Sequence, residues 1–197
     1  MAQPIEELRK IRLGKLAQIR KLGIEPYPAG CCREQTIAQA LALMGQKAAV
    51  AGRIRAVRGH GGIQFWDLQD ESGKIQLVFK RDDRNEKAAK LQGLLDIGDF
   101  IAAQGEVFRT KVGEISILVK DFQLLSKAIR PLPSNWYGLN DQEERYRKRY
   151  LDLVMNDKVR QMFVRKAQFW RECRRFMAEK GFMEVETQVL EIGRAHV

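Results

Sequence analysis

Three side chains interrupt the apolar alternation of strand-like segments and have the chemistry to recognise a nucleic-acid base. Phe65 is out of phase with Trp66 and Leu68. Gln76 and Glu114 are likewise out of phase with their apolar neighbours, so all three should face away from a core. An exposed ring can stack on an unpaired base, and an amide or carboxylate can hydrogen-bond to its edge. A single outward residue of any of these types is more often an ordinary surface residue without a binding role. Whether the three act together therefore depends on the secondary-structure elements that carry them.

Residues 47–125 alternate with a period of two in five segments, which predicts five β-strands. A stretch of helical composition, Asp83–Leu94, lies between the third and fourth segments. Five strands with a helix at that place are typical of an OB barrel, the five-stranded Greek-key barrel, with a small sandwich as the alternative. The residues predicted to share one side of the first strand are Val50, Gly52, Ile54 and Ala56.

A basic helix is predicted before the barrel, from Pro4 to Leu22, with Gly23 ending it. Its partial apolar stripe consists of Ile5, Leu8, Leu16 and Ile19. Two interpretations stay open: a solvated helix that packs lightly on the next domain, or an additional contact with RNA phosphates. The net charge of +10 favours a polyanionic partner but does not choose between nucleic acid, a membrane surface and solubility.

The chain is expected to turn helical beyond a linker. Asp157 is predicted to cap a long helix that runs to about Lys180, and Gly181 to stop it. Phe182–Glu186 is predicted to begin a strand. A long helix followed by one strand, with little after it, is typical of an unfinished domain.

No metal site is expected, because the three cysteines have no ligand spacing and only two histidines accompany them. An odd number of cysteines favours a reducing compartment, so we expect a cytoplasmic location. The sequence has no apolar run of about 18 residues, so no membrane span is expected.

Eight stretches of the chain, spread in order along nearly its whole length, resemble the lysine–tRNA ligases, which are class II aminoacyl-tRNA synthetases. The stretches are GIEPYP (23–28), AGR (51–53), FWDLQD (65–70), GKIQL (73–77), GEISI (113–117), KAIRPLP (127–133), RYRKRYLDL (145–153) and GFMEVET (181–187).

The resemblance implies that the barrel binds the anticodon loop of a lysine-accepting tRNA. Phe65 would stack on the middle uridine, Gln76 and Glu114 would address its edge, and Arg58 would contribute beside the first turn. Arg53 or Arg55 could hold phosphate. The implied domains are a basic helical extension (1–46), an OB-fold anticodon-binding domain (47–125), a linker (126–144) and the start of a class II catalytic domain of α+β architecture (145–192).

Residues 181–187 resemble motif 1, the helix-and-strand element on which class II enzymes form homodimers. The implied interface residues are Gly181, Phe182, Glu184, Val185, Glu186 and Thr187. Gln188 departs from the family, which has a proline there. Residues 193–197 also depart from it, and residues 191–197 back-translate to a sequencing adaptor, so 193–197 is expected to be an artefactual tail.

The family joins lysine to ATP as an adenylate, with Mg2+, and then transfers lysine to its tRNA. Motifs 2 and 3, which supply the catalytic groups, have no counterpart in the sequence, so we expect no catalytic residue and no activity from this chain alone. Two alternatives remain: a fragment of an aspartate– or asparagine–tRNA ligase, and a stand-alone OB protein that binds single-stranded nucleic acid. The linker and motif 1 argue against the second.

Overall fold

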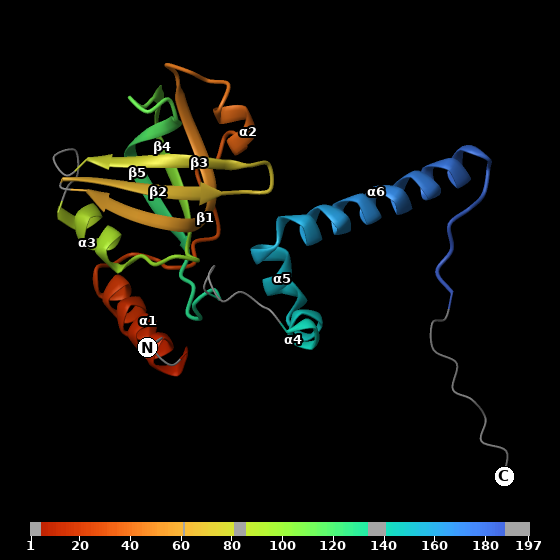
Figure 1. The fold of residues 1–197 in the computed structure, drawn as a ribbon, viewed down its shortest axis with the longest axis horizontal. Helices are drawn as coiled ribbons and strands as arrows, with labels where there is room; N and C mark the ends of the chain where they lie inside the picture. The colour runs from red at the N-terminus through yellow and green to blue at the C-terminus, as the bar shows by residue number, and fades with distance from the viewer. Residues whose placement is uncertain (1–4, 61, 81–85, 134–140, 188–197) are drawn as a thin grey trace, which may run out of the picture. The chain divides into compact units, whose positions relative to one another are not determined.

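The structure is a computed structural model that describes residues 5–60, 62–80, 86–133 and 141–187. The chain divides into two compact units, residues 1–132 and residues 133–197 (Figure 1). The first unit contains the barrel with its covering helices, and the second contains three further helices. Pro4, where the first helix was predicted to begin, lies outside the described residues. Gly61 and the residues from Gln188 onward, including the predicted tail, also lie outside them.

Five strands of the first unit close into a barrel with the order β1-β2-β3-β5-β4 (Figure 1). The strands are β1 (Lys47–His60), β2 (Ile63–Gln69), β3 (Lys74–Lys80), β4 (Phe100–Arg109) and β5 (Ile115–Ser126). Neighbouring strands are antiparallel except β3 and β5, which pair in parallel. Helix α3 (Glu86–Leu94) lies between β3 and β4 in the chain, as predicted. The predicted OB architecture is therefore confirmed.

The inside of the barrel is filled by the apolar side of each strand. Trp66 and Leu68 are buried, as their spacing predicted, and Trp66 packs on Phe79 with ring centroids 4.7 Å apart. Leu91 of α3 joins the same buried cluster. Residues of β2 in the opposite phase, namely Phe65 and Asp67, are consequently directed to the outer face.

A β-bulge in β1 changes which residues of this strand face outward. Ile54 pairs with Leu68 and Ala56 pairs with Asp67, so Arg55 is an extra residue between them. The prediction that Ala56 shares a side with Ile54 is therefore wrong, since the bulge shifts the alternation by one residue. It also places Arg58 directly across from Phe65.

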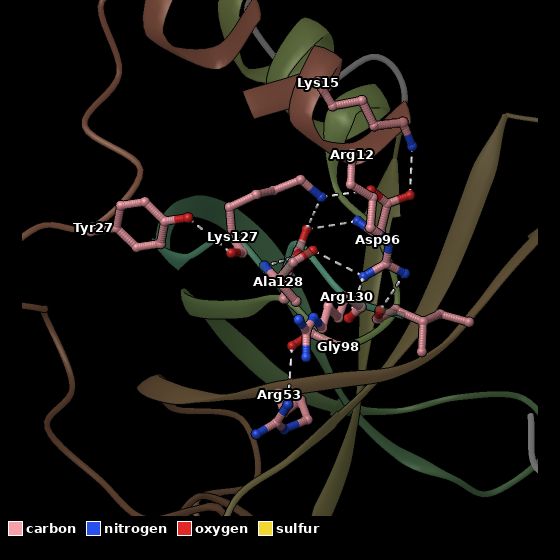
Figure 2. Close-up of polar contacts among 11 residues, drawn as sticks. Arg12, Lys15, Tyr27, Arg53, Asp96, Gly98, Lys127, Ala128 and Arg130 are labelled. Carbon is pink, nitrogen blue, oxygen red and sulfur yellow. Dashed lines mark hydrogen bonds and ion pairs between the residues drawn. The ribbon is translucent and has the colours of Figure 1, made fainter. Parts of the chain in front are cut away.

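Helix α1 (Ile5–Lys21) is fastened to the barrel unit by a polar cluster that the sequence did not reveal (Figure 2). Arg12 is 8% exposed and donates to the carbonyl oxygens of Ile97, Ala128 and Arg130. Lys15 Nζ lies 2.5 Å from Asp96 Oδ1. Two cations of α1 are thus used to dock it on the first unit, while most of the helix stays exposed, and a contact of α1 with RNA phosphates stays a prediction.

Lys127, whose side chain is fully buried, forms the centre of this cluster. Its Nζ lies 2.5 Å from Asp96 Oδ2 and 2.8 Å from Asp99 Oδ2. Burial raises the pKa of Asp96, but hydrogen bonds and charges from Lys127 and Lys15 outweigh it and the net pKa is lowered. A buried cation is thus matched by two carboxylates, which ties the segment after β5 to the loop before β4.

A short helix, α2 (Ile37–Ala40), was not predicted and packs against β1 and β3. Thr36 caps it, and Asp70 accepts a hydrogen bond from the Ile37 N–H at 2.9 Å. Burial raises the pKa of Asp70, but the hydrogen bonds from Ile37, Ser72 and Gly73 lower the pKa by more, so the net shift is downward. Asp70 therefore joins α2 to the β2–β3 turn.

The second unit contains α4 (Gln142–Arg147), α5 (Arg149–Met155) and α6 (Asp157–Glu179). The long helix was predicted, but its N-cap is Asn156 rather than Asp157: the Asn156 side chain accepts from the N–H groups of Lys158 and Val159. The strand predicted from Phe182 is wrong for the described residues, where 182–187 belong to no strand. A strand needs a partner ladder, and none is present in the described part of this unit.

Candidate nucleic-acid interface

The structure brings the four predicted binding residues to the outer side of neighbouring strands. Arg58 of β1 lies opposite Phe65 of β2, and Asp67 of β2 lies opposite Gln76 of β3. Residues directly opposite each other in a sheet share a face, and Phe65 and Asp67 share one because they are two apart. Glu114 immediately precedes β5 and reaches the same face through Gln76.

Phe65 is half-buried and directly precedes the buried Trp66 in β2. Its place in β2, opposite in phase to the core residues Trp66 and Leu68, turns the ring away from the interior. A ring held by a strand presents a fixed flat surface, which suits stacking on one base.

Gln76 is only 7% exposed, although it lies on the outer face. Its Nε2 donates to Glu114 Oε2 at 2.8 Å, and its Oε1 accepts from Ser116 Oγ at 3.0 Å. Glu114 is exposed, and its backbone N–H donates to Thr110 Oγ1 at 3.0 Å, which steadies it at the β4–β5 turn. An amide donor and a carboxylate acceptor are therefore held side by side.

Arg58 makes an ion pair with Asp67, with Nη2 and Oδ1 2.5 Å apart. The Arg58 side chain remains 57% exposed, so its guanidinium keeps access to solvent. Because a guanidinium carries five N–H donors, one contact with Asp67 leaves donors for a phosphate or a base. The ion pair with Asp67 restricts the Arg58 guanidinium to the side of the sheet that carries the Gln76 amide and the Glu114 carboxylate.

A hollow of about 340 Å³ lies beside Asp67, Gln76 and Glu114. This is near the lower end of the range for small-ligand sites, about 300–1,000 Å³, and is suited to one base rather than to a large ligand. Its lining residues are Leu41, Asp67, Lys74, Ile75, Gln76, Glu114 and Ile115.

The sequence prediction missed Asp67 and Ser116. Asp67 could have been found, because it is in phase with Phe65 in the FWDLQD stretch. Ser116 could not, because its contact with Gln76 depends on the parallel register between β3 and β5. Strand periodicity gives the face of a residue but not its neighbour on the next strand.

Arg53, predicted to contact phosphate, is already partly engaged. Its guanidinium carbon lies 4.3 Å from the centre of the Phe100 ring, and its Nη1 is 3.4 Å from the Gly98 carbonyl oxygen. Burial and the nearby positive charge of Arg55 lower the pKa of Arg53. A role in phosphate binding stays a prediction for both arginines.

The predicted interface residues of the second unit, 181–187, are exposed and follow α6 directly. Gly181 has φ 83°, so this position favours glycine where the helix ends. Glu184 pairs with Arg174 of α6 at 2.9 Å. Phe182 and Val185 are exposed large apolar residues of this segment, and α6 carries others, including Phe169, Trp170 and Phe176.

In the part of the chain that the structure describes, no three His, Cys, Asp or Glu residues are grouped to hold a metal ion. Among the same residues, no helix combines the length and apolar character needed to cross a membrane.

Two family models match the chain. One, described as an OB-fold nucleic acid binding domain, covers residues 48–125, which correspond closely to the barrel. The other, described as tRNA synthetases class II (D, K and N), covers residues 141–194.

Curated relatives are similar to nearly the whole chain. It is 46% identical over 191 residues to a lysine–tRNA ligase of Syntrophomonas wolfei, covering 95% of this chain and 39% of that protein. For a lysine–tRNA ligase of Carboxydothermus hydrogenoformans the identity is 44% over 192 residues, with the same two coverages. For that of Dehalococcoides mccartyi it is 43% over 198 residues, covering 95% of this chain and 40% of that protein. The chain thus spans about two fifths of the length of these relatives.

Proposed function

Because the chain is homologous to the N-terminal portion of lysine–tRNA ligases along 95% of its length, we propose that it binds the anticodon loop of a lysine-accepting tRNA. The anticodon-binding OB domain and the following class II part were both predicted, and both are found. We also propose which residues of the OB domain contact the anticodon.

The observation that carries the proposal is the pair of Gln76 and Glu114 at one small hollow, with Phe65 and Arg58 on the same outer face of the neighbouring strands. Uracil offers an acceptor, O4, next to a donor, N3–H. Gln76 Nε2 and the Glu114 carboxylate offer the complementary donor and acceptor. Phe65 would stack on the base and Arg58 would bind its phosphate or its edge.

The test is a titration of the full chain with labelled anticodon hairpins, followed by fluorescence anisotropy. We expect the lysine anticodon hairpin to bind more tightly than a hairpin with the same stem and an unrelated loop. Equal affinity for both hairpins would contradict the proposal.

A fragment of an aspartate– or asparagine–tRNA ligase is the second candidate, because the matching class II family includes all three specificities. These anticodons share a middle uridine, so the first and third bases must separate them. A preference for the aspartate or asparagine hairpin over the lysine hairpin would favour this candidate.

The activity of the whole protein is part of the same proposal: ATP- and Mg2+-dependent attachment of lysine to its tRNA, in the cytoplasm, by a homodimer. The free cysteines Cys31, Cys32 and Cys173 suit a reducing compartment. Residues 181–187 with the exposed apolar side chains near them would form the dimer interface. Among the described residues no group of three His, Cys, Asp or Glu is placed to hold a metal ion, and no residue is assigned to adenylate formation.

A further inference from the structure

The orientation of one amide decides what the hollow can recognise. A glutamine amide has a donor end, Nε2, and an acceptor end, Oε1, which differ little in shape. If Gln76 turned by half a revolution, the hollow would present an acceptor where it now presents a donor. Recognition of a base edge therefore requires a group that holds this amide in one orientation.

Ser116 is placed to do this from the neighbouring strand. It lies opposite Gln76 in the parallel β3–β5 register, and its Oγ donates to Gln76 Oε1 at 3.0 Å. Ser116 is 0% exposed and Gln76 is 7% exposed, so water has little access to replace this bond. The acceptor end of the amide is thereby held away from the ligand.

Glu114 acts on the other end of the same amide. Its Oε2 accepts from Gln76 Nε2 at 2.8 Å, and a reversed amide would set Oε1 against the carboxylate, acceptor against acceptor. An amide nitrogen carries two hydrogens, and the bond to Glu114 uses one of them. The second hydrogen and the other carboxylate oxygen form an adjacent donor and acceptor.

We propose that Ser116 is a positioning residue that locks the Gln76 amide and so makes the site prefer a base with a keto group beside an N–H, such as uracil, over cytosine. Cytosine has an amino group and an unprotonated ring nitrogen at the corresponding positions, so it meets donor with donor and acceptor with acceptor. The inference rests on the proposed function and extends it to the residue that sets base preference.

Loss of the Ser116 hydroxyl leaves a buried acceptor without its donor. Such a group relaxes by turning toward another donor or toward solvent, because a buried unsatisfied carbonyl oxygen is unfavourable. The Gln76 amide would then no longer present its N–H at a fixed place. The preference for uracil over cytosine should fall more than the affinity for RNA in general, since Phe65 and Arg58 are unaffected.

The experiment measures the affinity of the full chain for two hairpins that differ only at the middle anticodon base, uridine or cytidine. The variants are Ser116→Ala, Ser116→Thr and Ser116→Cys, with Ser126→Ala near the far end of β5 as the matched control. We expect the wild type and S126A to prefer uridine, and S116A to lose about tenfold of that ratio. S116T, which keeps the hydroxyl, should restore the ratio, and S116C, a weak donor, should give an intermediate value.

A merely structural serine would weaken binding of both hairpins equally, so an unchanged ratio in S116A overturns the inference. A wild type that binds hairpins without preferring uridine overturns it too, while leaving anticodon-loop binding itself in place. A wild type that does not distinguish hairpins from unrelated RNA overturns the proposed function as well. If S116A does not fold, as judged by circular dichroism, S116C decides alone, and a wild-type ratio in S116C overturns the inference.

Discussion

At the scale of single residues, the ring of Phe65 should make a large contribution to RNA affinity through stacking. Stacking of one base on an aromatic ring is worth about 1–3 kcal/mol. We predict that Phe65→Ala weakens binding of the lysine anticodon hairpin by about this amount, measured by anisotropy at fixed salt. Tyr27→Ala removes another exposed ring of the first unit, outside the hollow, and serves as the control. A wild-type titration curve for F65A would contradict the assignment.

Arg58 allows a different test because its contribution depends on salt. Each phosphate neutralised on single-stranded nucleic acid contributes about −0.7 to the slope of log affinity against log salt. If Arg58 binds a phosphate, Arg58→Ala should lower the affinity and make this slope shallower by about that value. Lys87→Ala removes the same charge from an exposed position on α3. A slope in R58A as steep as in the wild type would assign Arg58 to another role.

At the scale of elements, the docking of α1 depends on Lys127 and its two carboxylates. Breaking a buried ion pair by removing one partner costs about 3–5 kcal/mol, because the remaining charge stays buried. We predict a loss of unfolding free energy of that order for Lys127→Met, measured by urea denaturation of the full chain. Lys90→Met breaks the exposed pair with Glu86 and should leave the unfolding free energy nearly unchanged, because solvent screens that pair. We call Lys127 with Asp96 and Asp99 the Lys127 clamp. Equal losses of unfolding free energy in the two variants would contradict a stabilising role of this clamp.

Asp96 should make the same clamp sensitive to acid. Its pKa in the folded protein lies below the ordinary value of 3.8, so its stabilising contribution is present above that value and is lost as the pH falls through the folded pKa. We predict that Asp96→Asn flattens the loss of stability between about pH 4 and more acidic conditions. The melting temperature against pH measures this. An unchanged acid limb in D96N would show that the carboxylate does not set it.

The elements also show what could be predicted from the sequence and what could not. The strands and the outward Phe65 follow from local alternation, which is a property of neighbouring residues. The bulge at Arg55 shifts this alternation and is specified only by pairing with β2, so the side taken by Ala56 was predicted wrongly. The Lys127 clamp joins residues about 30 and more than 100 positions apart, and charge patterns in the sequence give no such distances.

At the scale of the whole molecule, we expect the first compact unit to bind RNA and the second to cause self-association. Because Ala128 and Arg130 hold Arg12 of α1, the first unit includes the segment after β5 up to Leu132. We predict that a chain ending at Leu132 binds the lysine hairpin as tightly as the full chain, but scatters less light, because the exposed apolar residues of α6 are gone. A large loss of hairpin affinity would contradict this division.

The central claim is that the outer face of β2 and β3 receives the middle base of the anticodon. A hairpin with 4-thiouridine at that position, bound to the full chain and irradiated, marks the residues that touch this base. Mass spectrometry of the digested adduct should locate the crosslink within residues 63–80 or at the start of β5, next to Glu114. Crosslinks found only on α1 or in residues 141–187 would contradict the account.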